Sequence, residues 1–404
     1  MTTIASDAPD HSASISGWIT FLLALSCGLI VANVYYAQPL VGPIAAELGL
    51  SPKAAGLVVT MTQIGYGIGL FFIVPLGDLV ENRRLVLSVM ALGAISLAAA
   101  AYATHLVPFF LATLCLGLGS VTVQILVPYA GHLAPEHIRG RVIGNVMTGL
   151  MIGILLARPA ASFIASMSSW HVVYALSAGI MVLLALVLRY ALPVRRPQAR
   201  LGYGALLVSM VRLALNTPVL RRRALYQASL FGVFNLFWTT VPLLLAGPDF
   251  RMSQTGIALF ALAGVGGAAI SPVAGRIADR GWTRPATAAG MVLTTAGFAL
   301  TLLAAPGSTL SLALLVIAAI VIDTGVQGNV TLGYRALFAL GAEHRSRLNG
   351  IYMTTFFLAG AAGSAIGAWA YVHGGWTLAA SIGGVMPLLT LIYLATEREP
   401  AASA

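Results

Sequence analysis

Long apolar segments alternate with short polar ones along the whole chain. A helix needs about 20 mainly apolar residues to cross a bilayer, and such a pattern locates helix ends only to within a few residues. We expect spanning helices at 17–40, 53–76, 84–103, 107–131, 141–165, 170–192, 222–245, 254–277, 285–304, 309–335, 347–371 and 376–395. The pattern therefore predicts an all-α membrane protein with twelve transmembrane helices.

These spans fall into two groups of six, separated by the longest polar stretch of the chain. Part of that stretch, 203–215, has apolar residues on one face and basic residues on another, so we expect a helix that lies on the membrane surface. The N-terminal residues lack the basic n-region of a cleavable signal peptide. The expected parts are a tail at 1–16, a six-helix bundle at 17–192, a linker at 193–221, a second six-helix bundle at 222–395 and a tail at 396–404.

The same residues recur at matching places in the two groups of spans. The stretch 136–148 returns as 343–354 with one residue deleted, and its Glu, His, two Arg, Gly, Met and Thr keep their order. Recurrence at a fixed spacing is the sign of an internal repeat, so we expect two copies of one six-helix unit. Other matching pairs are Asn33 with Asn235, Pro39 with Pro242, Asp78 with Asp279, and Trp170 with Trp376.

Composition agrees with a membrane protein, and charge adds an orientation. Of the 404 residues, 59% are hydrophobic and 8% are charged, whereas soluble domains have about 25% charged residues. The net charge of +10 comes from arginines on one side of the spans, while Lys53 and Arg251 lie on the other side. Because basic loops stay in the cytoplasm, we expect an inner-membrane protein with both termini cytoplasmic. The positive charge then indicates contact with anionic lipid rather than with nucleic acid.

Signatures of other function classes are missing from the sequence. It has no Walker loop and no His-Glu-x-x-His, Cys-x-x-Cys or Gly-x-Ser-x-Gly motif. Cys27 and Cys115 both lie in apolar runs, without the spacing of a disulfide or a metal site. We therefore expect no enzymatic activity, no cofactor and no metal.

Twelve spans, a repeat of six plus six and a basic central loop resemble the major facilitator superfamily, over nearly the whole chain. The resemblance implies two bundles related by a pseudo-twofold axis, with a solute site between them near the middle of the membrane. It also implies alternating access to that site, a small-molecule substrate, protons as the coupling ion, and a monomer.

Two loops on the basic side resemble the cytoplasmic signature of this family. The loop at 275–284 (GRIADRGWTR) matches it well, whereas the loop at 77–84 (GDLVENRR) keeps its Asp and two Arg. The resemblance implies a latch in which a loop carboxylate faces the positive N-terminus of another helix; the alternative is that these charges only orient the helices. The expected latch residues are Asp78, Arg83, Arg84, Arg139, Arg141, Asp279, Arg280, Arg284, Arg345 and Arg347.

Two charged residues lie inside spans, Arg158 in the fifth and Asp323 in the tenth. Charges at this depth are costly unless paired or hydrated, and they are functional by default. We therefore expect that Asp323 carries a proton, or that Asp323 and Arg158 together gate the cavity. The alternatives are a static buried pair, or an Arg158 that binds an anionic group.

Polar and aromatic residues gather on the first, fourth, seventh and tenth spans, which line the cavity in the family that the chain resembles. Amides and aromatic rings that face a cavity would bind an amphipathic or aromatic solute; the alternative is helix packing and interhelical hydrogen bonding. The expected substrate-binding residues are Asn33, Tyr35, Tyr36, Gln38, Gln124, Phe234, Asn235, Trp238, Gln327 and Asn329.

Two stretches, 33–40 (NVYYAQPL) and 153–158 (GILLAR), are similar to a branch of bacterial inner-membrane exporters of drugs or sugars. The sequence departs from the family's proton-coupled exporters at Thr113, where many have an arginine. The first hypothesis is proton-coupled efflux of small amphipathic compounds. The alternatives are proton-linked or facilitated uptake of a small organic anion held by Arg158, and a non-transporting membrane sensor or enzyme on the same fold.

Overall fold

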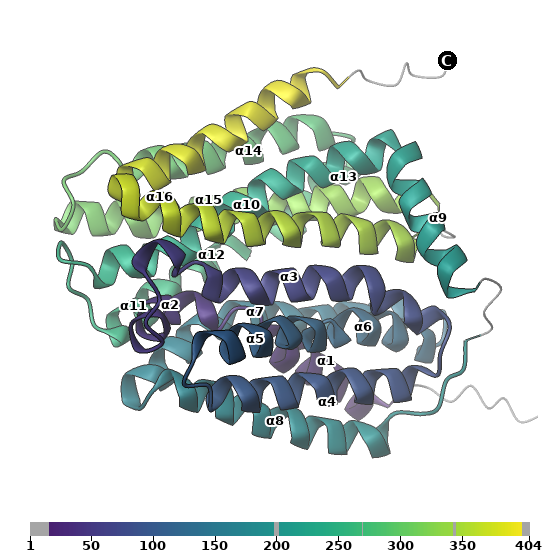
Figure 1. The fold of residues 1–404 in the computed structure, drawn as a ribbon. Helices are drawn as coiled ribbons and strands as arrows, with labels where there is room; N and C mark the ends of the chain where they lie inside the picture. The colour runs from purple at the N-terminus through teal and green to yellow at the C-terminus, as the bar shows by residue number, and fades with distance from the viewer. Residues whose placement is uncertain (1–15, 198–201, 269, 342–344, 398–404) are drawn as a thin grey trace, which may run out of the picture.

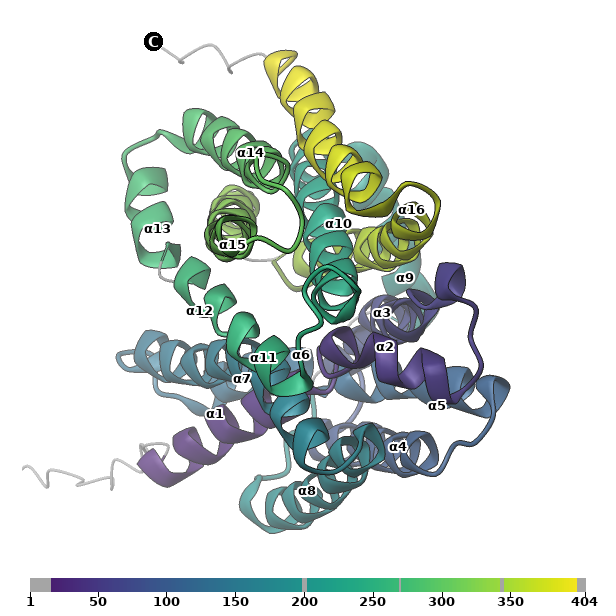
Figure 2. The same cartoon turned by 90° about the vertical axis from the view of Figure 1, so that its left-hand side faces the viewer.

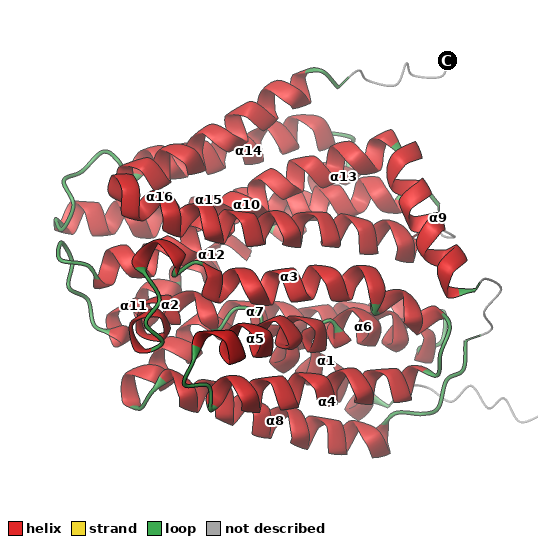
Figure 3. Cartoon of the chain, in the orientation of Figure 1, coloured by secondary structure: helices red, strands yellow, loops and turns green. Residues whose placement is uncertain are grey.

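The computed structural model describes residues 16–197, 202–268, 270–341 and 345–397. All regular elements in this part of the chain are helices (Figure 3). The predicted tails therefore lie almost wholly outside the described residues. The prediction of an all-α membrane fold is confirmed.

In the first group, some spans are single helices and others are divided into two shorter helices. Its elements are α1 (Gly17–Ala32), α2 (Ala37–Glu47), η1 (Pro52–Ala54), α3 (Leu57–Phe72), η2 (Val74–Asp78), α4 (Asn82–Ala101), α5 (Leu106–Ser120), α6 (Thr122–Leu133), α7 (Arg139–Met167) and α8 (Trp170–Ala191). The linker forms α9 (Tyr203–Asn216), close to the helix expected at 203–215.

The second group of spans follows the same order. Its elements are α10 (Pro218–Ala246), α11 (Gln254–Ala261), α12 (Ala263–Ala268), α13 (Ser271–Asp279), α14 (Thr283–Leu300), α15 (Thr309–Phe338) and α16 (Arg345–Ala395). Helix α16 holds two spans, because its backbone leaves the helical region at Gly374 and Gly375, where Gly375 has φ +60°. Among the described residues, ten helical stretches are long and apolar enough to cross a membrane. One of them, α16, contains two spans, and α14 is not among the ten. Counting α16 twice and including α14 gives the twelve expected spans.

The first span differs from its prediction in length and shape. It extends to Glu47, beyond the expected end at residue 40, and a turn at 33–36 separates α1 from α2. Non-helical backbone inside a membrane is tolerated where it is buried in protein or lines a cavity. The break places the start of α2 against α10 of the other bundle.

Two bundles lie side by side, and α9 crosses one end of them (Figure 1). We call this end, which carries α9, η2 and the starts of α7 and α16, the basic end, and the opposite end the far end. Helix α3 packs along α16, and at the far end α7 packs against α11, where Ser162 Oγ donates to the Gln254 carbonyl at 2.8 Å. Helix α13 packs against α14 and α15 and stands apart from α7 (Figure 2).

Small residues let α1 and α7 cross at close range. A Cβ atom on Gly28 would lie 2.6 Å from the carbonyl oxygen of Gly149, and one on Gly153 would overlap the backbone of Gly28. The repeat-related helices cross in the same way, since a Cβ on Gly363 would overlap the backbone of Gly232. Close approach through small residues is how spanning helices gain packing energy in lipid.

We expect Gly153→Ala to destabilise the protein by about 1–3 kcal/mol, because the added methyl group meets backbone that cannot move aside. Gly144→Ala on the same helix is the matched control, since a Cβ there has nothing within 4 Å. The midpoint of thermal unfolding in detergent checks this. Equal midpoints for the two variants would contradict the close crossing of α1 and α7.

Candidate functional site

Arg158 on α7 is the centre of a buried polar cluster between the bundles. Its side chain is 3% exposed, and its Nε donates to Oε1 of Gln38 on α2 at 2.6 Å. The guanidinium carbon lies 4.4 Å from the ring centre of Trp238, 5.0 Å from that of Phe234 and 5.2 Å from that of Tyr35. These distances are within the range of cation–π attraction. The charge is therefore held by an amide and three aromatic rings.

Asp323 on α15 is buried and also contacts Trp238. Its Oδ1 accepts a hydrogen bond from Trp238 Nε1 at 2.9 Å. Neither Asp323 nor Arg158 forms an ion pair with a described residue, although they interact electrostatically. Glycines make room for the carboxylate, since a Cβ on Gly264 would lie 2.9 Å from Asp323 Oδ2. The Trp238 indole thus contacts both charged residues, the guanidinium with its ring face and the carboxylate with its N–H.

Asn235 on α10 joins the two bundles through hydrogen bonds. Its Oδ1 accepts from Gln38 Nε2 at 2.9 Å and from Gln63 Nε2 at 2.8 Å, and its Nδ2 donates to the Phe231 carbonyl at 3.0 Å. Gln63 lies on α3 and was not among the expected site residues. The available signal was an amide inside an apolar span, but the prediction considered four other spans as cavity-lining.

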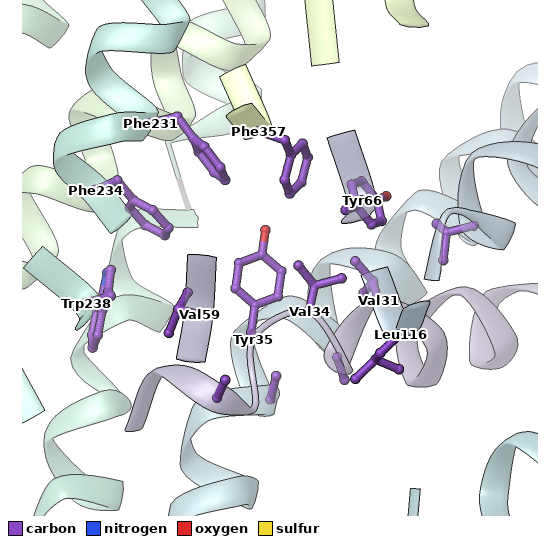
Figure 4. Packing of buried hydrophobic residues seen from close by; sticks show 14 of the residues in the cluster. Val31, Val34, Tyr35, Val59, Tyr66, Leu116, Phe231, Phe234, Trp238 and Phe357 are labelled. Carbon is purple, nitrogen blue, oxygen red and sulfur yellow. The ribbon is translucent and has the colours of Figure 1, made fainter. Parts of the chain in front are cut away.

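Aromatic rings surround this cluster. Phe231 stacks on Phe234 with ring centres 5.4 Å apart and meets Phe357 edge-on at 5.1 Å. Phe357 in turn lies 4.4 Å from Tyr66 of α3. Figure 4 shows these rings around Tyr35, with contributions from both bundles. A solute that combines a flat apolar part with a polar group would find partners for both here.

The structure brings together seven of the expected charged and substrate-binding residues. They are Tyr35, Gln38, Arg158, Phe234, Asn235, Trp238 and Asp323. They come from α7, α10, α15 and the stretch around the α1–α2 break. The break brings Tyr35 and Gln38 to the interface between the bundles.

Two expected residues on the first span point elsewhere. Asn33 Oδ1 accepts a hydrogen bond from Ser177 Oγ on α8, within the first bundle. Tyr36 also interacts with Ser177 and lines a groove between α1 and α7. The prediction placed these residues in the cavity because they are polar; the break at 33–36 turns them toward α8 instead.

Three more expected residues lie near the cluster but outside it. Gln124 Nε2 donates to the Tyr66 hydroxyl at 3.2 Å, within the first bundle. Asn329 Nδ2 donates to Gln227 Oε1 at 2.8 Å, within the second bundle. Gln327 is half-buried on α15. Gln124 and Asn329 therefore form hydrogen bonds between helices of one bundle, which is the alternative to a role in solute binding.

The loop after the second span meets the start of α16 at the basic end. The Asp78 carboxylate forms a hydrogen bond with the Ser346 side chain and interacts electrostatically with Arg347 and Arg195. Asp78, Ser346 and Arg347 also line a small crevice with Gly350. A carboxylate at the N-terminus of a helix is stabilised by the helix dipole. This contact therefore connects the two bundles at the basic end.

The repeat-related loop does not make the matching contact. Asp279 Oδ1 lies 2.9 Å from Arg335 Nη1 of the same bundle, whereas Arg139 and Arg141 are exposed at the start of α7. In this structure, Asp78 therefore faces a helix start of the other bundle, whereas Asp279 pairs within its own bundle. The reason is geometric, because α13 stands apart from α7.

The other expected latch residues contact their own bundle or are exposed. Arg83 donates to the Leu192 carbonyl, Arg84 pairs with Glu81, Arg284 donates to the Ala395 carbonyl, Arg345 donates to the Phe338 carbonyl, and Arg280 is exposed. None of these four contacts crosses between the bundles.

The cluster is closed to solvent in this structure. The cavity beside Arg158 and Trp238 has a volume of about 10 Å³, which is about the least that a single water molecule needs. Residues of α2, α7, α10 and α11 line it. A solute can therefore reach the cluster only when the bundles separate.

Comparison with known proteins agrees with this architecture. A model of the Major Facilitator Superfamily matches residues 20–339. The chain is 39% identical to the "Uncharacterized transporter YgaY" of Escherichia coli O157:H7, over 95% of this chain and 96% of the relative. It is 33% identical to the "Probable transporter SCO4007" of Streptomyces coelicolor, over 94% of this chain and 87% of the relative.

Two solved structures show a similar fold. The nucleoside transporter NupG superposes with a TM-score of 0.73 at 15% identity, over 92% of this chain and 99% of its own. The xylose transporter XylE of E. coli superposes with a TM-score of 0.68 at 16% identity, over 95% of this chain and 99% of its own. The match of the family model over residues 20–339, together with the 39% identical relative, shows that the chain belongs to the major facilitator superfamily of membrane transporters.

Proposed function

We propose that this transporter exports small amphipathic solutes in exchange for protons, across an inner membrane with its basic end in the cytoplasm. The two bundles rock about the cluster and expose it to one side at a time. Arg158, Gln38 and Asn235 hold the polar part of the solute, and the rings around Tyr35 hold its apolar part. Asp323 takes up and releases the proton.

The contact of Trp238 with both Arg158 and Asp323 carries this proposal. Trp238 and Asp323 belong to the second bundle, whereas Arg158 belongs to the first. A proton that binds Asp323 removes the charge to which the indole N–H donates. The same indole holds the guanidinium across the interface. Protonation thus acts on a contact between the bundles, which is what coupling requires.

Transport by purified protein in liposomes tests the direction. With an imposed pH gradient, we expect dyes or drugs to move against the flow of protons. If organic acids alone move, and only along the proton gradient, the export proposal is wrong.

A second candidate function is uptake of a small organic anion. One observation favours it: Nη2 of Arg158 is buried and has no hydrogen-bond partner among the described residues. A carboxylate could accept from that nitrogen in a strong, charge-assisted bond. Under this proposal, the protein in the same liposomes does not transport neutral or cationic solutes. Different organic acids compete with one another for a single site.

We expect Gln63→Met to raise the KM for the transported solute about two- to tenfold, since one hydrogen bond contributes about 0.5–1.5 kcal/mol. The substitution removes one of the two donors to Asn235 Oδ1 that come from the first bundle. Gln124→Met is the matched control, because Gln124 bonds to Tyr66 within the first bundle. If Gln124→Met raises the KM more than Gln63→Met does, the hydrogen bonds of Asn235 across the bundles do not support solute binding.

We also propose that the contact of Asp78 with the start of α16 latches the basic end in this conformation. Asp78→Asn should lower the transport rate about two- to fivefold, since a charge at a helix end contributes about 0.3–1 kcal/mol. Asp279→Asn should have a smaller effect, because Asp279 pairs with Arg335 inside its own bundle. Equal rates for wild type and Asp78→Asn would remove the latch from the mechanism.

A further inference from the structure

A groove runs along the outer surface of the first bundle, between α1 and α7, which lie side by side in Figure 2. Its volume is about 870 Å³. Its apolar walls include Phe21 and Leu25 of α1 and Ile152 and Leu156 of α7, each between 41% and 56% exposed. Large apolar side chains that are exposed on spanning helices are suited to contact with lipid.

This groove is separate from the solute cluster. With 3.6 residues per turn, Ile152 and Leu156 lie about 120° and 160° around α7 from Arg158. Arg158 points to the interface between the bundles, so the groove opens on the opposite side of the helix. The mechanism proposed above makes no use of it.

Polar side chains of α7 line the groove toward its basic end. They include Arg141 and Asn145, which lie one turn apart and are both exposed. Arg141 forms no ion pair with any residue that the structure describes. Farther along the same wall the lining changes to Ile152 and Leu156. A cation at the mouth and hydrocarbon beyond it is the order in which a phospholipid presents its phosphate and acyl chains.

The repeat-related groove of the second bundle lacks this pattern. It lies between α10 and α16, has a volume of about 430 Å³, and has no basic residue in its lining. The last part of α16, from Ile382 to Tyr393, forms one of its walls. Arg222 lies near its mouth, but its guanidinium sits 4.8 Å from the Tyr393 ring and donates to Thr396 Oγ1 at 3.2 Å. The cationic mouth is therefore a feature of the first groove.

We propose that the groove between α1 and α7 binds one anionic phospholipid of the leaflet at the basic end. The Arg141 guanidinium holds the phosphate, since its planar N–H donors match phosphate oxygens, and Asn145 adds a donor. An acyl chain lies between Phe21 and Leu25 on one side and Ile152 and Leu156 on the other. The proposal does not depend on which solute is transported.

Native mass spectrometry of the purified full chain tests this after incubation with equal amounts of phosphatidylglycerol and phosphatidylethanolamine. We expect wild type to retain one phosphatidylglycerol preferentially. Arg141→Gln should lower its retention about tenfold, because a hydrogen bond to a charged group contributes about 1.5–3 kcal/mol. Arg139→Gln is the matched control: it removes the same charge from the same turn, and Arg139 does not line the groove.

A second variant tests the apolar part of the groove. Ile152→Trp fills the space between the helices and should lower the retention of phosphatidylglycerol as strongly as Arg141→Gln. The proposal is overturned if Arg141→Gln retains as much phosphatidylglycerol as wild type, if Arg139→Gln loses as much as Arg141→Gln, or if Ile152→Trp retains the lipid at the wild-type level.

Discussion

Asp323→Asn is expected to abolish gradient-driven solute transport, to the level of liposomes without protein, while solute exchange continues. Asparagine has nearly the shape of the carboxylate, and its side-chain oxygen can still accept from Trp238 Nε1. It cannot take up or release a proton. The cluster should therefore still bind solute and be exposed to each side of the membrane in turn, but without coupling to protons. Counterflow and gradient-driven uptake into the same liposomes separate the two activities.

Asp249→Asn is the matched control for this substitution. Asp249 is exposed in the loop between α10 and α11 at the far end, so its neutralisation changes the net charge equally without touching the cluster. Gradient-driven transport by Asp323→Asn at the wild-type rate would remove Asp323 from the coupling role.

Arg158→Gln is expected to weaken solute binding about 10- to 100-fold, since hydrogen bonds to charged groups contribute about 1.5–3 kcal/mol. The substitution removes the donor to Gln38 and the cation that lies against Trp238, Phe234 and Tyr35. The apparent affinity of the solute, measured by competition with a fluorescent substrate, checks this.

Arg158→Lys separates the contribution of the positive charge to solute binding from that of the guanidinium's shape. Lysine keeps the charge, but it lacks the planar fork that donates to an amide and stacks on rings at the same time. An intermediate affinity is expected. Arg251→Gln, at the exposed far end, serves as the control for loss of charge. If Arg158→Gln binds solute as tightly as Arg251→Gln does, the cluster is not the solute site.

Most of the fold was predictable from the sequence because the membrane allows few alternatives. Backbone groups in lipid must bond within helices, so an apolar run such as 170–192 becomes one helix, observed as Trp170–Ala191. The breaks were not predictable from hydropathy. Both α1 and α2 are apolar, yet a turn at 33–36 separates them and α2 packs against α10 of the other bundle. A hydropathy pattern carries no information of that kind.

The charged members of the cluster were predictable because a charge inside a span stands out against its surroundings. Arg158 and Asp323 are such charges, but their position relative to each other was not predictable from the sequence. A direct pair was one of the possibilities, whereas in the structure they form no ion pair and both contact the Trp238 indole. The amides of the cluster were harder to predict. The sequence does not distinguish an amide that bonds within one bundle from one that bonds across the two bundles. Gln63 and Gln124 illustrate the two cases.

The central claim is that solute and proton act on one cluster, in which Trp238 connects Arg158 with Asp323. Calorimetry of solute binding in two buffers of different ionisation enthalpy tests it most directly, because it counts the protons released on binding. We predict that wild type releases a proton when solute binds and that Asp323→Asn binds solute without releasing one. Equal proton release by wild type and Asp323→Asn would contradict the claim.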